Sequence, residues 1–79
     1  MVCVRLFAAL REAAGTGEVE VAAGPLELIL ADLARRYGPA FARLLSSASV
    51  LVDGERLSQP SAPVADEAEV ALLPPFSGG

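Results

Sequence analysis

The stretch GPLELILADLARRYGP, residues 24–39, decides which fold the chain can form. Its large apolar side chains recur at the spacing of one helical face, and they are Leu26, Ile29, Leu30, Leu33 and Tyr37. Pro25 fits the first helical position, where its missing N–H is harmless, and Gly38-Pro39 fits the end of a helix. The stretch therefore predicts one amphipathic helix over residues 25–37, and we expect its apolar face to fill the core.

Two strands are predicted before this helix. Residues 2–8 and 18–22 alternate apolar with polar side chains, which is typical of strands that bury one face. Residues 9–14 predict a short helical turn between them, closed by Gly15 and Gly17. We expect the two strands to pair as a hairpin.

A second hairpin is predicted after the helix. Residues 49–52 and 55–58 flank Asp53-Gly54, a dipeptide that favours tight hairpin turns because both of its residues tolerate a positive φ. Ahead of this hairpin, the apolar side chains of residues 40–45 predict a short second helix. The long helix is therefore flanked by strands on both sides.

The last predicted strand, residues 69–73, follows a loop over residues 59–67. Two hairpins that flank one long helix predict an α+β fold with a mixed sheet wrapped on that helix, which is the β-grasp arrangement of ubiquitin-like domains. Pro74-Pro75 forbids further ladder pairing. We therefore assign residues 1–73 to the β-grasp domain and residues 74–79 to an extended, flexible C-terminal tail.

The composition limits the kinds of partner. The chain has 79 residues and a net charge of −4, with six arginines scattered among ten acids and no lysine, which argues against a nucleic-acid partner. No apolar run approaches the ~18 residues of a membrane helix. The lone Cys3 cannot form an internal disulfide. We therefore expect a cytoplasmic protein with no membrane partner.

The chain also lacks the residues of most catalytic sites. It has no histidine, which excludes histidine-based triads, general bases and zinc sites. Cys3 has no histidine or second cysteine to activate it, so we interpret it as an inert small residue rather than a sulfur relay. No glycine-rich phosphate loop is present. We therefore expect the chain to bind no metal and no cofactor of its own.

The most informative segment is the tail, PPFSGG at residues 74–79. Six residues at ~3.3 Å each can place a terminal carboxylate ~20 Å from the domain. Gly78 and Gly79 have no Cβ to obstruct a narrow channel. A free carboxylate is a poor electrophile, so we expect its activation as an acyl-adenylate made from ATP that a partner binds. The alternative is a frayed terminus without a role.

Two stretches resemble one protein family. The closing VALLPPFSGG, residues 70–79, closely resembles the end of the small subunit of molybdopterin synthase, and FAALREAAG, residues 7–15, resembles that family's first strand and turn. The resemblance extends over essentially the whole chain. The chain differs at residues 66–69, DEAE, where the family often has Asp-Gly-Asp before the last strand. This difference changes a turn rather than the chemistry.

The resemblance implies a sulfur carrier that is not catalytic alone. In that family a ubiquitin-activating-like adenylyltransferase adenylates the terminal glycine, and a sulfur donor enzyme converts it to a thiocarboxylate. The tail then enters the large subunit of molybdopterin synthase and donates sulfur in molybdenum cofactor biosynthesis. By this resemblance the thiocarboxylate belongs on Gly79, with Gly78 as its slender neighbour.

Other functions of the tail stay open. The chain could be a sulfur carrier for thiamine or cysteine biosynthesis, or a protein modifier whose Gly79 forms an isopeptide bond with a target lysine. It could also be an interaction module with an incidental tail. Because β-grasp domains host all of these functions, the fold alone does not separate them.

The predicted partner-binding residues lie on the sheet and in the tail. By alternation, Phe7, Leu51 and Leu73 point away from the helix, and their strands are neighbours in a β-grasp sheet. One patch of this kind is typical of an interface, whereas scattered surface hydrophobics are the alternative. We expect an aromatic anchor from the tail to add to it. The full set is Phe7, Leu51, Leu73, Pro74, Pro75, Phe76 and Ser77.

Overall fold

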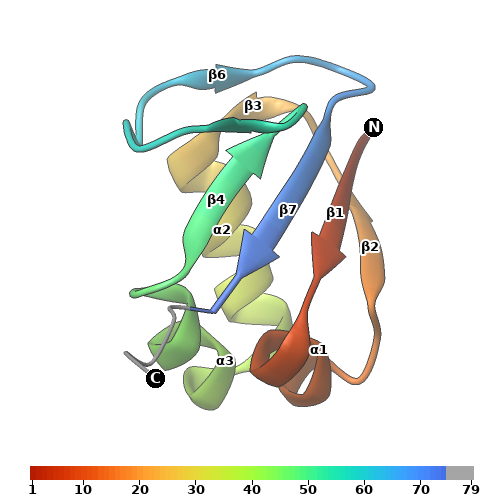
Figure 1. Cartoon of the computed structure of the whole chain (residues 1–79), viewed down its shortest axis with the longest axis vertical. Helices are drawn as coiled ribbons and strands as arrows, with labels where there is room; N and C mark the ends of the chain where they lie inside the picture. The colour runs from red at the N-terminus through yellow and green to blue at the C-terminus, as the bar shows by residue number, and fades with distance from the viewer. Residues whose placement is uncertain (75–79) are drawn as a thin grey trace.

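The computed structural model of the chain describes residues 1–74. A central sheet covers one long helix, and two shorter helices close one end of the sheet (Figure 1). In chain order the elements are β1 (Val2–Leu6), α1 (Ala8–Ala14), β2 (Glu18–Val21), β3 (Gly24–Pro25), α2 (Leu26–Tyr37), α3 (Pro39–Leu45), β4 (Ser49–Val52), β5 (Glu55–Arg56), β6 (Pro63–Val64) and β7 (Glu69–Leu73).

The main sheet has the strand order β2-β1-β7-β4-β5, so the last strand lies in its centre. β7 runs parallel to β1 and antiparallel to β4, and the two hairpins form the edges (Figure 1). The pairings Val4↔Val70 and Val50↔Leu72 put apolar side chains together on the face that α2 covers. The predicted α+β fold, a mixed β-grasp sheet on one main helix, is confirmed.

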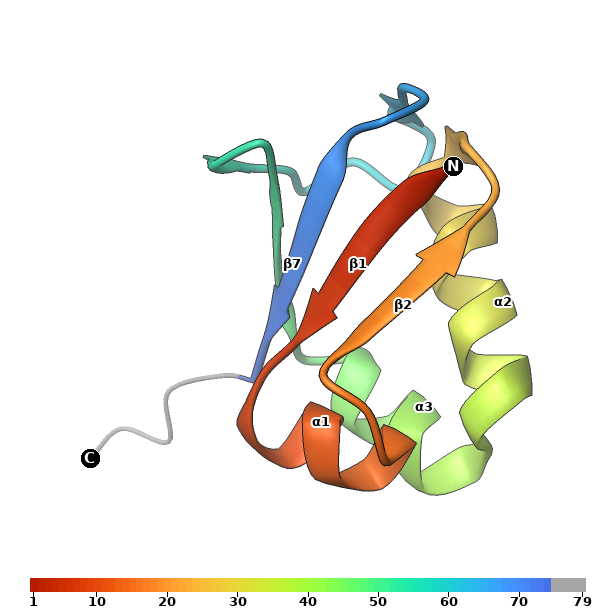
Figure 2. The same ribbon diagram turned by 90° about the vertical axis from the view of Figure 1, so that its right-hand side faces the viewer.

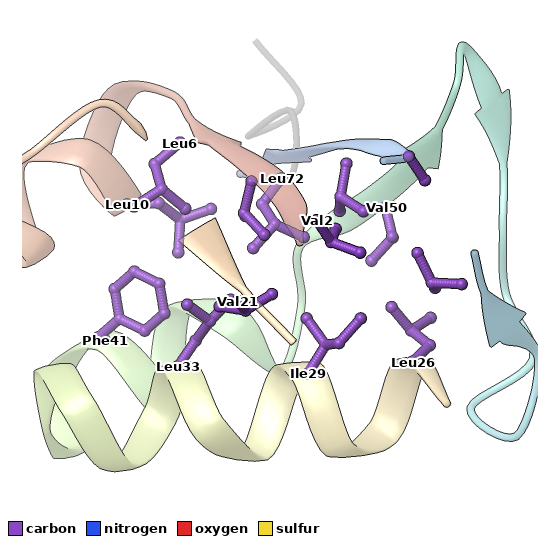
Figure 3. Close-up of a cluster of buried hydrophobic side chains, with 14 residues drawn as sticks. Val2, Leu6, Leu10, Val21, Leu26, Ile29, Leu33, Phe41, Val50 and Leu72 are labelled. Atoms are coloured by element: carbon purple, nitrogen blue, oxygen red, sulfur yellow. The ribbon is translucent and has the colours of Figure 1, made fainter. Parts of the chain in front are cut away.

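The core lies between this face and the helices. Leu26, Ile29 and Leu33 are buried on the side of α2 that faces the sheet, as the helical spacing predicts (Figure 3). Phe41 of α3 is fully buried at the end of this row and stacks at a tilt on Tyr37, with ring centroids 5.1 Å apart. Each of these large side chains is worth about 1.5–3 kcal/mol on full burial, before the entropy of ordering.

The start of α2 differs from the prediction. Pro25 lies just before the helix with extended backbone angles (φ −60°, ψ 144°), and the first helical residue is Leu26. No side chain caps this end. Instead, the N–H groups of Leu26 and Glu27 donate to the carbonyl oxygens of Ala62 and Pro60, at 2.9 and 2.8 Å. A distant loop thus satisfies two of the donors that every helix start leaves open.

That loop contains a strand, so its prediction as a loop throughout was wrong. β6 pairs antiparallel with β3, through Gly24↔Val64 and Pro25↔Pro63. Val64 is buried. Two residues have too little alternation to be recognised in a sequence.

The ends of three predicted strands also shift by one or two residues. The first strand ends at Leu6 rather than residue 8, the second at Val21, and the return strand of the second hairpin at Arg56 rather than residue 58. The predicted tight turn at Asp53-Gly54 is confirmed, since both residues have a positive φ (49° and 86°). Within residues 1–74, none of the helices combines the length and the apolar character needed to cross a bilayer.

Candidate docking face and tail root

The face of the sheet that points away from α2 has an apolar part beside the end of β7. Leu51 pairs with Ala71, and Ser49 pairs with Leu73, so the side chains of these residues share this face. A depression of about 200 Å³ lies among them, and its lining residues are Ser49, Leu51, Arg56, Leu73 and Pro74. The structure therefore brings Leu51, Leu73 and Pro74, three of the predicted partner-binding residues, to one place.

Phe7 lies on the same face, one strand away. Its backbone is still extended (φ −123°, ψ 149°), and the pairing Leu6↔Leu72 places it level with Leu73. The chain then turns sharply into α1 through Ala8, which has φ 52°. Because Leu6 and Leu10 are buried on the helix side, Phe7 is left 40% exposed. The depression itself does not include Phe7.

The other part of this face is charged. The Nε atom of Arg5 lies 2.8 Å from a carboxylate oxygen of Glu69 and 3.9 Å from one of Glu18, so Arg5 links β2 and β7 across β1. Glu69 is the main reason that the pKa of Arg5 is raised. The face thus changes from acidic and ion-paired near the start of β7 to apolar near its end.

Cys3 belongs to the charged part. Its thiol donates a hydrogen bond to Oε2 of Glu18 at 3.1 Å. This hydrogen bond, with burial and the negative charge of Glu18, raises the pKa of the Cys3 thiol. A protonated thiol is a weak nucleophile, which fits the interpretation of Cys3 as an inert residue.

Arg56 and Ser49 line the depression, and the sequence interpretation assigned them no role. A signal for Arg56 was available. A two-residue turn at Asp53-Gly54 dictates the pairing Leu51↔Arg56, so a partner-facing Leu51 implies that Arg56 stands beside it. Arg56 is exposed.

The remaining predicted site residues, Pro75, Phe76, Ser77, Gly78 and Gly79, lie outside the residues that the structure describes. The structure does describe Pro74, the first residue of the predicted tail, which we call the root of the tail. β7 leads directly to Pro74, which is half-buried in the wall of the depression, at the end of the sheet where α1 and α3 lie (Figure 2). The tail therefore starts on the partly apolar face.

A larger hollow of about 320 Å³ lies on the helix side of the same sheet edge. Apolar residues of α2 and the loop after β5 form much of its wall, including Leu26, Leu30, Leu57 and Pro60. Among residues 1–74, no three histidine, cysteine, aspartate or glutamate side chains are grouped as metal ligands would be.

Solved structures of other proteins share this fold. The small archaeal modifier protein 1 of Methanosarcina acetivorans is 32% identical, with a TM-score of 0.86 over 99% of this chain and 95% of that chain. An Amycolatopsis orientalis BexX/CysO complex matches at 26% identity and a TM-score of 0.82, over 100% of both chains. In a complex of subunits 1 and 2 of molybdopterin-converting factor from Helicobacter pylori, the matching chain is 22% identical with a TM-score of 0.75, covering 99% and 97%, and it supports the fold alone.

No protein among the curated sequences matches the chain significantly. The model of the ThiS family, however, matches residues 4–79, which includes the tail and all of the sheet except the first two residues of β1. Together with the shared fold, this match confirms the family resemblance of the opening and closing stretches. The chain belongs to the ThiS family of ubiquitin-like sulfur carrier proteins.

Proposed function

We propose that this chain carries sulfur as a thiocarboxylate on Gly79 and donates it as the small subunit of molybdopterin synthase. The observation that supports this most is the path of β7. The central strand leads straight into Pro74 at the edge of a partly apolar face, so a partner bound to that face would meet the tail at its root. The family match continues to residue 79.

The chemistry takes place in partners. A carboxylate oxygen of Gly79 attacks the α-phosphorus of ATP in a ubiquitin-activating-like adenylyltransferase, and pyrophosphate leaves. A sulfur donor enzyme then supplies a sulfide equivalent, which attacks the acyl carbon while AMP leaves. At the oxidation level of sulfide this exchange is redox-neutral. The chain itself contributes the acyl group and the docking face, by which we mean the sheet surface around Phe7, Leu51, Leu73 and Pro74 that points away from α2. ATP is a substrate of the activating enzyme.

The docking face gives the residues their roles. Phe7, Leu51 and Leu73 would contact the large subunit through apolar surface, and Phe76 would anchor the tail. Pro74 and Pro75 would hold the exit extended, and Ser77 and Gly78 would pass through the channel ahead of the reactive Gly79. The PPFSGG ending favours the molybdopterin pathway over carriers for thiamine or cysteine biosynthesis.

Intact-mass measurement tests the proposal. The protein is incubated with a ubiquitin-activating-like adenylyltransferase, ATP and a sulfur donor enzyme, and a second sample lacks ATP. We expect a mass gain corresponding to the exchange of one oxygen for sulfur, only with ATP and only on the C-terminal peptide. Conversion of the molybdopterin precursor after addition of the large subunit then tests the pathway. If the sulfurated protein transfers no sulfur in that step, the assignment to molybdopterin synthase is wrong.

A second candidate function is protein modification. The 32% identity to small archaeal modifier protein 1 favours it. In this case the same incubation with target proteins would yield adducts of higher mass joined to lysine side chains. Because this chain has no lysine, it cannot form lysine-linked polymers of itself, and every lysine-linked adduct would identify another protein.

A further inference from the structure

Arg56 stands at the edge of the docking face. It lines the depression beside Leu51 and Leu73, and it also lines the hollow on the helix side of the sheet. β5 is the outermost strand on this side, and Arg56 is exposed to solvent. A group that approaches Leu51 or Pro74 therefore passes close to this cation.

Arg56 differs from half of the arginines in having no ion-pair partner within residues 1–74. Arg5, Arg35 and Arg36 each lie within 4.0 Å of a carboxylate oxygen, provided by Glu18, Glu69 or Asp32. Within residues 1–74 no carboxylate pairs with the other three arginines, Arg11, Arg43 and Arg56. Of these three, Arg56 is the one that lines the depression described above beside Leu51 and Leu73, within residues 1–74.

The depression suits a side chain rather than a small-molecule ligand. At about 200 Å³ it is smaller than the ~300–1,000 Å³ of ligand pockets. Its wall combines the apolar residues Leu51, Leu73 and Pro74 with Ser49 and the cationic residue Arg56. Arginine pairs with a carboxylate through two parallel N–H···O bonds, a geometry that lysine cannot reproduce.

We propose that Arg56 is a specificity-determining residue of the docking face, and that it receives an Asp or Glu carboxylate of the activating enzyme next to an apolar side chain that enters the depression. This inference rests on the proposed function, since it takes the activating enzyme as the protein that receives the tail. The activating enzyme is the partner to test because the carrier and modifier functions both require it.

The chain's own terminal carboxylate is the competing occupant. Five residues follow Pro74, and at ~3.3 Å each they can reach back to the edge of the sheet. Such self-pairing would hold the tail away from the enzyme, so loss of Arg56 would then speed activation. Pairing with the enzyme predicts the opposite, because loss of Arg56 would weaken docking. The two occupants are thus distinguished by the sign of the effect.

The experiment measures binding of the full chain to the activating enzyme without ATP, and then the KM and kcat of adenylation with ATP. The variants are Arg56→Gln and Arg56→Lys, with Arg43→Gln as the control of equal charge change on another exposed and unpaired arginine of the described residues. We expect Arg56→Gln to raise the Kd for the enzyme about 10- to 100-fold, and the loss of adenylation efficiency to appear as a higher KM. The Kd of Arg56→Lys should lie between those of the wild type and Arg56→Gln. Arg43→Gln should stay within about twofold.

Equal effects of Arg56→Gln and Arg43→Gln would overturn the proposal, since they would show a general charge effect. Faster activation of Arg56→Gln would overturn it in favour of the chain's own tail. If the wild-type protein binds the enzyme but is not adenylated, the proposed function fails while the binding comparison still decides the role of Arg56. If the wild-type protein does not bind, both are wrong.

Discussion

Asp53 and Glu69 are joined by two hydrogen bonds across the sheet. The N–H of Asp53 donates to the carbonyl oxygen of Glu69 at 2.8 Å, and the N–H of Glu69 donates to Oδ1 of Asp53 at 3.0 Å. Asp53 also begins the tight turn of the second hairpin, with φ 49°. One residue therefore fastens the turn between β4 and β5 to the first residue of β7.

Asp53→Ala should destabilise the domain by about 1.5–3.5 kcal/mol. The change removes one hydrogen bond, worth about 0.5–1.5 kcal/mol net, and leaves alanine in a left-handed conformation that costs roughly 1–2 kcal/mol. Asp53→Asn is the matched control, since asparagine keeps an acceptor oxygen and tolerates positive φ. Urea denaturation measures both. Equal stability of the two variants would show that neither effect matters here.

Phe7→Ala and Phe41→Ala should separate docking from folding. Phe41 is fully buried, and its truncation should cost about 3–5 kcal/mol of stability. Phe7 is 40% exposed on the docking face, so its loss should change the melting temperature by only a few degrees and weaken partner binding. Thermal melts and titration calorimetry with the large subunit give the two readouts. A large loss of stability in Phe7→Ala would place this side chain in the core instead.

Deletion of Gly79 should leave the domain folded and abolish sulfur transfer. Residues 1–74 contain the whole sheet, so the melting curve and the amide spectrum should match those of the full chain. Addition of one residue after Gly79 should have the same effect, because it removes the reactive carboxylate without shortening the tail. Sulfur transfer by the shortened protein would contradict the assignment of Gly79.

Glu18→Gln should make Cys3 more reactive. The carboxylate of Glu18 accepts the hydrogen bond of the thiol, and this is the main reason that the pKa of Cys3 is raised. Without the negative charge the pKa of Cys3 should fall, so more thiolate is present at pH 8 and alkylation by iodoacetamide should be faster. Glu20→Gln, a change of the same charge on the same strand, should leave the rate close to that of the wild type. An unchanged rate in Glu18→Gln would mean that this hydrogen bond does not control the thiol.

The sequence was sufficient for those parts of the fold that depend on local patterns. The spacing of Leu26, Ile29 and Leu33 predicts α2, and Asp53-Gly54 predicts the second hairpin. The pairing of β3 with β6 was missed because it depends on contacts between residues about 40 positions apart in the chain, namely Gly24 with Val64 and Pro25 with Pro63.

The same distinction applies to the docking face. Alternation along single strands predicts that Leu51 and Leu73 face outward, and the sheet order then makes them neighbours. The role proposed for Arg56 depends on which arginines are already paired with carboxylates. That pairing is set by side-chain distances in the folded domain. No pattern along one strand contains this information.

The central position of β7 has a consequence for synthesis of the protein. A ribosome makes this strand after all the others, and until it emerges β1 and β4 have no partner between them. The same strand bears the tail. An incomplete chain therefore has neither a complete sheet nor the C-terminal carboxylate that we propose is activated, so an activating enzyme that recognises both would act only on finished, folded molecules.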